Sequence, residues 1–253
     1  MKKIIYIELN YKKYIENIKY YFENQYKEII FKQRNEVRSV YFNSEDKEFV
    51  VKKFKVPHIL NRIIYKYIRD SKAESSYKNS LKLLKLNVNV PKPIGFCIEE
   101  NFFIISSSYY VSENIIYEFD IRYVLENQYL KNRNQILKEF IKFSFELHNK
   151  GINHLDYSPG NIIIKVINDN HILKYKFYIL DLNRVRFEVM DIEKRIGNLS
   201  KLTNNKLNNY IIINEYSKLI KKDRKYIKKI YDKYKKKEIK YLKMKKRIKE
   251  FLL

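Results

Sequence analysis

The sequence is poor in several residue types, and each scarcity narrows the possible folds. It has one cysteine (Cys97), four glycines, four prolines and no tryptophan in 253 residues. A lone cysteine cannot form an internal disulfide, and no Cys/His cluster has zinc-ligand spacing, so a reducing, cytoplasmic setting is expected. No uncharged apolar run approaches the roughly 18 residues of a membrane span. The apolar start of the chain is interrupted at Glu8, too early for a signal peptide.

Acidic residues are scarce relative to basic ones, with 29 Asp and Glu against 53 Lys and Arg and a formal net charge of +24. The bias toward Lys, Ile, Asn and Tyr is that of an AT-rich coding sequence, so part of the charge carries no functional information. The remainder is concentrated: residues 218–249 contain 17 Lys or Arg and three acids, a net charge of +14. Such a charge favours nucleic acid, nucleotide phosphates or an anionic membrane surface as partner.

The first part of the chain has the pattern of a small mixed lobe. Short β-rich runs separated by polar breaks in residues 27–55 predict an antiparallel meander. Residues 71–86 have helical periodicity, and residues 94–98 and 102–106 predict a further hairpin. We therefore expect a first, β-rich lobe with one helix over residues 1–110.

The second part of the chain is mainly helical. Its best helical segment is residues 132–149, and the apolar runs 161–164 and 177–180 after it predict a short hairpin. We expect a second lobe over residues 111–253. Residues 1–26 lie outside these patterns and are expected to form an additional N-terminal element.

Polar residues that suit phosphoryl transfer stand around this second hairpin. The chain reads His154-Leu155-Asp156-Tyr157-Ser158-Pro159-Gly160-Asn161 before the hairpin and Asp181-Leu182-Asn183 after it. Phosphoryl transfer needs a carboxylate near the nucleophile's proton, an oxygen ligand for a divalent metal, and a second carboxylate that bridges the metal to nucleotide phosphates. Asp156, Asn161 and Asp181 can supply these groups, and the Asp-x-x-x-x-Asn spacing lets one loop turn both of its side chains toward one cavity.

This pattern resembles the protein-kinase catalytic loop followed by the Asp-Phe-Gly position. The sequence is more closely similar to the lipopolysaccharide core kinases that phosphorylate Kdo or heptose. That similarity rests on the stretches Asp156 to Asn161, Asp181 to Phe187, Val90 to Ile94 and Val56 to Ala73, and it covers roughly residues 30–190. It implies an α+β, bilobal protein-kinase-like fold, with a small antiparallel-sheet N-lobe and a mainly helical C-lobe.

The resemblance also implies roles for single residues. It makes Asp156 the catalytic carboxylate, Asn161 and Asp181 the ligands of Mg²⁺, and Lys52 the strand lysine that holds the α- and β-phosphates of ATP. Lys53 faces the other side of the strand in this register, although a one-residue slip would exchange the two lysines.

Other positions complete or depart from the kinase pattern. Glu74 is the predicted carboxylate partner of Lys52. The turn between the first two strands has no glycine, so Arg34 or backbone N–H groups would have to contact the phosphates. Leu155 replaces the arginine that pairs with a phosphorylated activation loop, and no Ala-Pro-Glu follows Asp181. These departures disfavour a protein substrate and favour a small or glycolipid acceptor.

Four neighbouring residues have a structural and a functional interpretation. His154 is expected to pack and to bond the loop backbone rather than to titrate in catalysis, and His148, at the end of the helix, is expected to be structural as well. Arg184 and Arg186 either orient an anionic acceptor by bidentate contacts or pair with carboxylates inside the lobe.

The basic C-terminal stretch repeats apolar residues at three-, four- and seven-residue steps between Ile220 and Ile248. This predicts one basic amphipathic helix, or two with a break near Glu238. The helices either close the second lobe with solvated lysines or attach the protein to an anionic membrane face.

The leading hypothesis is ATP- and Mg²⁺-dependent phosphoryl transfer to a sugar hydroxyl of the lipopolysaccharide inner core, Kdo or heptose. The acceptor is then a lipid A-core glycolipid, and the enzyme is cytoplasmic and peripheral on the inner face of the inner membrane. The alternatives are a kinase for another small-molecule or protein acceptor, a pseudokinase scaffold, and a basic nucleic-acid-binding protein. No nucleic-acid partner is expected, because the sequence shows no RRM, KH or helix-turn-helix pattern.

Overall fold

The computed structural model describes residues 2–42, 47–56, 70–101, 104–170 and 172–251. The chain divides into two compact units: unit 1 is Met1–Ile116 with Leu180–Arg184, and unit 2 is Tyr117–Ile179 with Val185–Leu253. Most of the Val56 to Ala73 stretch that carries part of the resemblance, residues 57–69, lies outside the described residues. Phe102 and Phe103, which belong to the hairpin predicted from residues 94–98 and 102–106, lie outside them as well.

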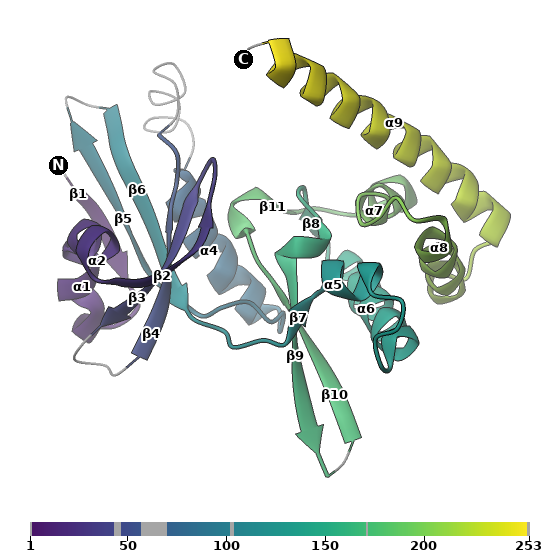
Figure 1. Cartoon of the computed structure of the whole chain (residues 1–253), viewed down its shortest axis with the longest axis horizontal. Coiled ribbons are helices and arrows are strands. Elements are labelled where there is room, and N and C mark those ends of the chain that lie inside the picture. Colours follow the sequence, from purple (N-terminus) through teal and green to yellow (C-terminus); the bar gives the residue numbers. More distant parts are fainter. Residues whose placement is uncertain (1, 43–46, 57–69, 102–103, 171, 252–253) are drawn as a thin grey trace. The chain divides into compact units, whose positions relative to one another are not determined.

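Unit 1 is built on a six-stranded antiparallel sheet with the order β1-β5-β6-β4-β3-β2 (Figure 1). Its strands are β1 (Lys2–Tyr6), β2 (Tyr26–Lys32), β3 (Glu36–Phe42), β4 (Lys47–Lys53), β5 (Pro93–Asn101) and β6 (Ile104–Glu113). β4 lies between β3 and β6, with Lys52 opposite Val37 and Tyr110. The predicted antiparallel meander is therefore confirmed, and a sixth strand, β1, is added to it.

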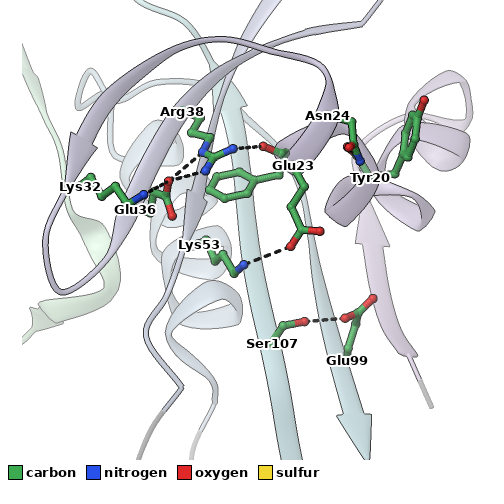
Figure 2. A network of polar contacts seen from close by, with 10 residues as sticks. Tyr20, Glu23, Asn24, Lys32, Glu36, Arg38, Lys53, Glu99 and Ser107 are labelled. Carbon is green, nitrogen blue, oxygen red and sulfur yellow. Dashed lines mark hydrogen bonds and ion pairs between the residues drawn. The ribbon is translucent and has the colours of Figure 1, made fainter.

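The N-terminal segment covers one face of this sheet. After β1 come η1 (Leu9–Tyr11), α1 (Lys12–Glu16) and α2 (Ile18–Asn24), whose buried side chains Ile15, Ile18 and Phe22 pack on the sheet residues of the same core. Arg38 of β3 connects the sheet to this segment (Figure 2). Its guanidinium donates to Glu36 Oε1 and to the carbonyl oxygen of Phe22 in α2. The Cζ atom of Arg38 also lies 4.5 Å from the centre of the Phe22 ring, within cation–π range.

Helix α4 (Lys72–Lys85) covers the other face of the sheet. Ser71 caps it, because its Oγ accepts a hydrogen bond from the Glu74 backbone N–H. Its apolar face contributes Ala73 and Tyr77 to a core with side chains of β5 and β6. Strand alternation explains the two cores, since successive side chains of β6 point to opposite faces.

Unit 2 is mainly helical. Its helices are α5 (Ile121–Glu126), α6 (Arg133–Asn149), α7 (Ile192–Leu199), α8 (Lys206–Ile220) and α9 (Arg224–Phe251). Its strands are β7 (Phe119–Asp120), β8 (Ile152–His154), β9 (Ile162–Asp169), β10 (Ile172–Ile179) and β11 (Val185–Phe187), paired as β10-β9-β7 and β11-β8. The predicted helix 132–149 and the hairpin after it are present as α6 and as β9 with β10.

Most of the basic C-terminal stretch forms one long helix, α9, which continues through Glu238 without a break (Figure 1). Of the two predicted alternatives the structure therefore has the unbroken helix, because a single glutamate among good helix formers does not interrupt the backbone hydrogen bonding. Within the part of the chain that the structure describes, no helix combines the length and the apolar character needed to cross a membrane.

Candidate active site

The candidate residues are divided between the two units. Unit 1 contains Lys52, Glu74, Arg34 and Asp181, and unit 2 contains the loop from His154 to Asn161. Asp181 belongs to unit 1 although it follows strand β10 of unit 2.

Lys52 and Asp181 form an ion pair in unit 1. The distance from Lys52 Nζ to Asp181 Oδ1 is 2.6 Å, and the two side chains are 17% and 22% exposed. Lys53, the next residue of β4, lies on the opposite face and pairs with Glu23 of α2 at 3.4 Å. The structure therefore has the register in which Lys52, and not Lys53, reaches the aspartate.

The backbone of Asp181 is held in an unusual conformation. Its φ is 55°, in the left-handed region that costs a residue other than glycine on the order of 1 kcal/mol or more. The next residue is anchored from α4, because Asn79 Nδ2 donates to the carbonyl oxygen of Leu182 at 2.8 Å. The segment is thus fixed so that the carboxylate of Asp181 points at Lys52.

Several cations gather around this carboxylate. Lys72, at the first position of α4, is partly buried, and burial lowers the pKa of its ammonium group. The positive charges of Arg34, Arg184 and Lys52 lower that pKa further, whereas Asp181 acts in the opposite direction. Lys52 and Lys72 are partly buried, Arg34 and Arg184 are exposed, and phosphate oxygens would neutralise the charges of all four cations.

The catalytic-loop candidates of unit 2 lie in a loop held by its own hydrogen bonds. Asn161 Nδ2 donates to the carbonyl oxygen of Asp156 at 3.0 Å, and the Asp156 backbone N–H donates to His154 Nδ1 at 3.2 Å. From α7's side, Lys201 Nζ donates to the carbonyl oxygen of Leu155 at 3.0 Å. The hydrogen bond between Asn161 and Asp156 therefore closes a compact turn. It uses the Nδ2 atom of Asn161, and the amide oxygen takes no part in it.

Three comparisons with known proteins bear on this arrangement. The family model of the lipopolysaccharide kinase (Kdo/WaaP) family matches residues 24–231. The chain belongs to this family. The match covers the Lys52, Asp156, Asn161 and Asp181 positions, so the resemblance predicted from the motifs is confirmed at the level of the family.

Solved structures agree on the fold. One of them, WaaP in complex with acyl carrier protein, has a TM-score of 0.62 and 11% identity, covering 94% of this chain and 98% of that one. The Rio2 kinase from Chaetomium thermophilum has a TM-score of 0.52 and 12% identity, covering 89% and 76% of the two chains. At these identities the likeness shows the kinase-like α+β fold alone. No curated protein matches the chain.

Glu74 does not take the place predicted for it in this kinase family member. Both of its carboxylate oxygens lie 2.8 Å from Lys3 Nζ, and Lys78 Nζ is 3.0 Å away. The sequence prediction paired Glu74 with Lys52. The difference arises because β1, which periodicity did not reveal, brings Lys3 to the start of α4, while Lys52 bonds Asp181 instead.

Arg34 lies in the glycine-free turn between β2 and β3. The turn is closed by the Gln33 N–H donating to the Asn35 carbonyl oxygen at 3.1 Å, and Asn35 Oδ1 accepts from the Lys55 backbone N–H at 3.2 Å. These bonds fix the turn by side-chain and backbone contacts rather than by glycine. Arg34 is close enough to Lys72 for its charge to act there.

Two residues near the site had no role in the sequence prediction. Lys72 could have been noticed because it lies inside the Ser-x-x-Glu helix start, where the positive end of the helix dipole repels a lysine. Arg122 of α5 lies against the loop: a Cβ placed on Gly160 would overlap its guanidinium. No sequence pattern would have indicated that contact, since it joins residues of two separate elements.

The residues beneath the loop are structural. Tyr157 is buried, its hydroxyl lies 2.7 Å from Ser144 Oγ, and burial raises its pKa above the usual range. His148 Nδ1 lies 2.7 Å from the Tyr216 hydroxyl, and burial lowers the pKa of His148 to about 3. A histidine that stays neutral at physiological pH supports the structural interpretation of this residue.

Proposed function

We propose that this protein transfers the γ-phosphoryl group of ATP to a sugar hydroxyl of the lipopolysaccharide inner core, Kdo or heptose, on a lipid A-core glycolipid. The observation that carries the proposal is the Lys52–Asp181 ion pair at 2.6 Å within a group of cations. Family membership supports a kinase, and the pair supplies the two charged groups that kinases apply to nucleotide phosphates.

Binding of the nucleotide falls to the cationic group of unit 1. Lys52 would leave Asp181 for the α- and β-phosphates, while Lys72, Arg34 and Arg184 contact the remaining phosphate oxygens. Without nucleotide the four cations repel one another. Bound phosphates would attract all four, so the repulsion among them would favour nucleotide binding. A small residue is not needed at the turn, because Arg34 takes over the contact that glycine-rich loops make with backbone N–H groups.

The metal ligands in this proposal are Asp181 and Asn161. One carboxylate and one amide oxygen are hard oxygen donors, and Mg²⁺ typically takes one or two such protein ligands together with substrate phosphates. The Nδ2 atom of Asn161 is engaged with Asp156, which directs its oxygen away from that bond. A bound Mg²⁺ would neutralise charge on the phosphates during transfer.

Asp156 is the proposed catalytic carboxylate. It would accept the proton of the attacking sugar hydroxyl as the phosphoryl group is transferred. His154 accepts a hydrogen bond from the Asp156 backbone N–H and therefore helps to fix the backbone that carries the carboxylate. Arg122, which packs on Gly160 of the same loop, is placed to meet a carboxylate or phosphate of the acceptor.

The test is transfer of labelled γ-phosphate to purified lipid A bearing core sugars, with mass spectrometry to locate the new phosphate. We expect Asp156→Asn and Asp181→Asn to abolish transfer. The matched control is Asp169→Asn, an exposed aspartate of β9 whose partner is Lys174. Transfer that survives in both site variants, with thermal denaturation unchanged, would refute the assignment.

Two further measurements separate the alternatives. Calorimetry with ATP and Mg²⁺ tests for a pseudokinase, because a scaffold without nucleotide binding shows no heat of binding. An acceptor series of Kdo-lipid A, heptose-containing core, soluble sugars and proteins identifies the acceptor. A protein or soluble acceptor that outcompetes both glycolipids would contradict the proposed substrate.

A further inference from the structure

The first half of α9 is part of the core of unit 2. Ile227, Ile230 and Tyr231 are buried, and the Tyr231 hydroxyl donates to Asn209 Oδ1 of α8 at 2.7 Å. Tyr234 contacts Gly197 of α7, and its hydroxyl donates to Glu193 at 2.9 Å. This half of the helix is therefore held by neighbours, and its apolar stripe is used for packing.

The second half of α9 presents the continuation of the same stripe to solvent. Tyr241, Leu242 and Met244 are 54%, 45% and 53% exposed. Tyr241 follows Tyr234 by seven residues and Met244 by three more, so they extend the face that packs in the first half. We call residues 239–244 the exposed end of α9.

The charges around this face are of one sign. Residues 236–250 contain eight Lys or Arg, of which Arg247 is the single arginine, against Glu238 and Glu250. Lysine is depleted at protein–protein interfaces, where arginine is enriched, so this composition argues against a protein partner. An apolar face with exposed tyrosine, flanked by lysines, is the pattern of helices that lie in the plane of an anionic lipid surface.

We propose that the exposed end of α9 binds an anionic phospholipid membrane surface. Tyr241, Leu242 and Met244 enter the boundary between headgroups and acyl chains, and Lys240, Lys243 and their neighbours contact the anionic headgroups. Binding itself does not depend on the kinase reaction. Its consequence, that the enzyme is held at the surface carrying a glycolipid acceptor, rests on the proposed function.

The test is sedimentation of the full chain with vesicles of phosphatidylcholine alone or with added phosphatidylglycerol. We expect binding to the anionic vesicles, reduced about tenfold or more by Lys240→Glu/Lys243→Glu, since each basic residue near the surface contributes severalfold. The matched control is Lys165→Glu/Lys176→Glu, two exposed lysines of β9 and β10. No preference for anionic vesicles, or an equal loss in the control, would overturn the proposal.

A second measurement reports insertion directly. Because the sequence has no tryptophan, Tyr241→Trp places a single fluorescent reporter on the apolar face. Its emission should shift to shorter wavelength with anionic vesicles, whereas Tyr129→Trp, at a fully solvated position, should not shift. A shift produced by oligonucleotides or acidic proteins and not by vesicles would refute the lipid surface.

Phosphoryl transfer to detergent-dispersed acceptor should persist in the α9 variants, so loss of transfer in the unmodified chain would count against the proposed function alone.

Discussion

Buried His148 predicts a specific loss of stability in mild acid. Its Nδ1 lies 2.7 Å from the Tyr216 hydroxyl, Arg195 adds a nearby positive charge, and its Nε2 has no hydrogen-bond partner among the described residues. Protonation in the folded state is therefore opposed by burial and by the charge of Arg195.

The magnitude follows from proton linkage. An unfolded histidine takes up its proton near its ordinary pKa of 6.5, whereas folded His148 does so at about 3. Between these values the unfolded state binds more protons, so stability is complete above the ordinary pKa and falls with decreasing pH. The free energy of unfolding should drop by about 1.4 kcal/mol at about pH 5.5 from this residue alone.

The assay is urea denaturation followed by circular dichroism at about pH 7.5 and about pH 5.5, above the main carboxylate range. His148→Asn keeps an acceptor near Tyr216 but cannot take up the proton. We expect the pH-dependent loss to be about 1.4 kcal/mol smaller in this variant, because titration of every other group is common to both proteins. Equal losses in the two proteins would refute the burial argument.

Three further predictions concern the site. Lys72→Met should weaken ATP binding about tenfold in calorimetry, because a contact between a partly buried ammonium group and a phosphate is lost. The control Lys85→Met, at the exposed last residue of α4, should leave ATP affinity unchanged. Gly160→Ala should reduce transfer by displacing Arg122, and in a double-mutant cycle its effect should shrink when Arg122 is already alanine. Glu74→Gln should lower the free energy of unfolding by on the order of 1 kcal/mol, because the ion pairs with Lys3 and Lys78 are lost, while ATP affinity stays within about twofold. A large loss of ATP affinity would instead support the predicted role of Glu74 as the partner of Lys52.

Features set by neighbouring residues were predictable from the sequence. The helical periods of residues 132–149 and 71–86 depend on contacts within a few residues, and both helices occur where they were predicted. The spacing from Asp156 to Asn161 likewise indicated the kinase family, because both residues belong to one short loop whose pattern is visible in the chain itself. Family membership is confirmed.

Long-range pairings were decided by the tertiary structure. Glu74 pairs with Lys3, 71 residues away in the sequence, because β1 joins the sheet beside β5. The sequence pattern did not predict that strand. Lys52 pairs with Asp181, 129 residues away in the sequence. Asp181 has a left-handed backbone conformation, which an aspartate in the sequence does not by itself predict. Which cations surround Asp181 depends on how β4, α4 and the returning segment are placed together. Periodicity reports the local face of an element, whereas the partner of a charged side chain depends on sheet order and chain return, and only the folded chain specifies these.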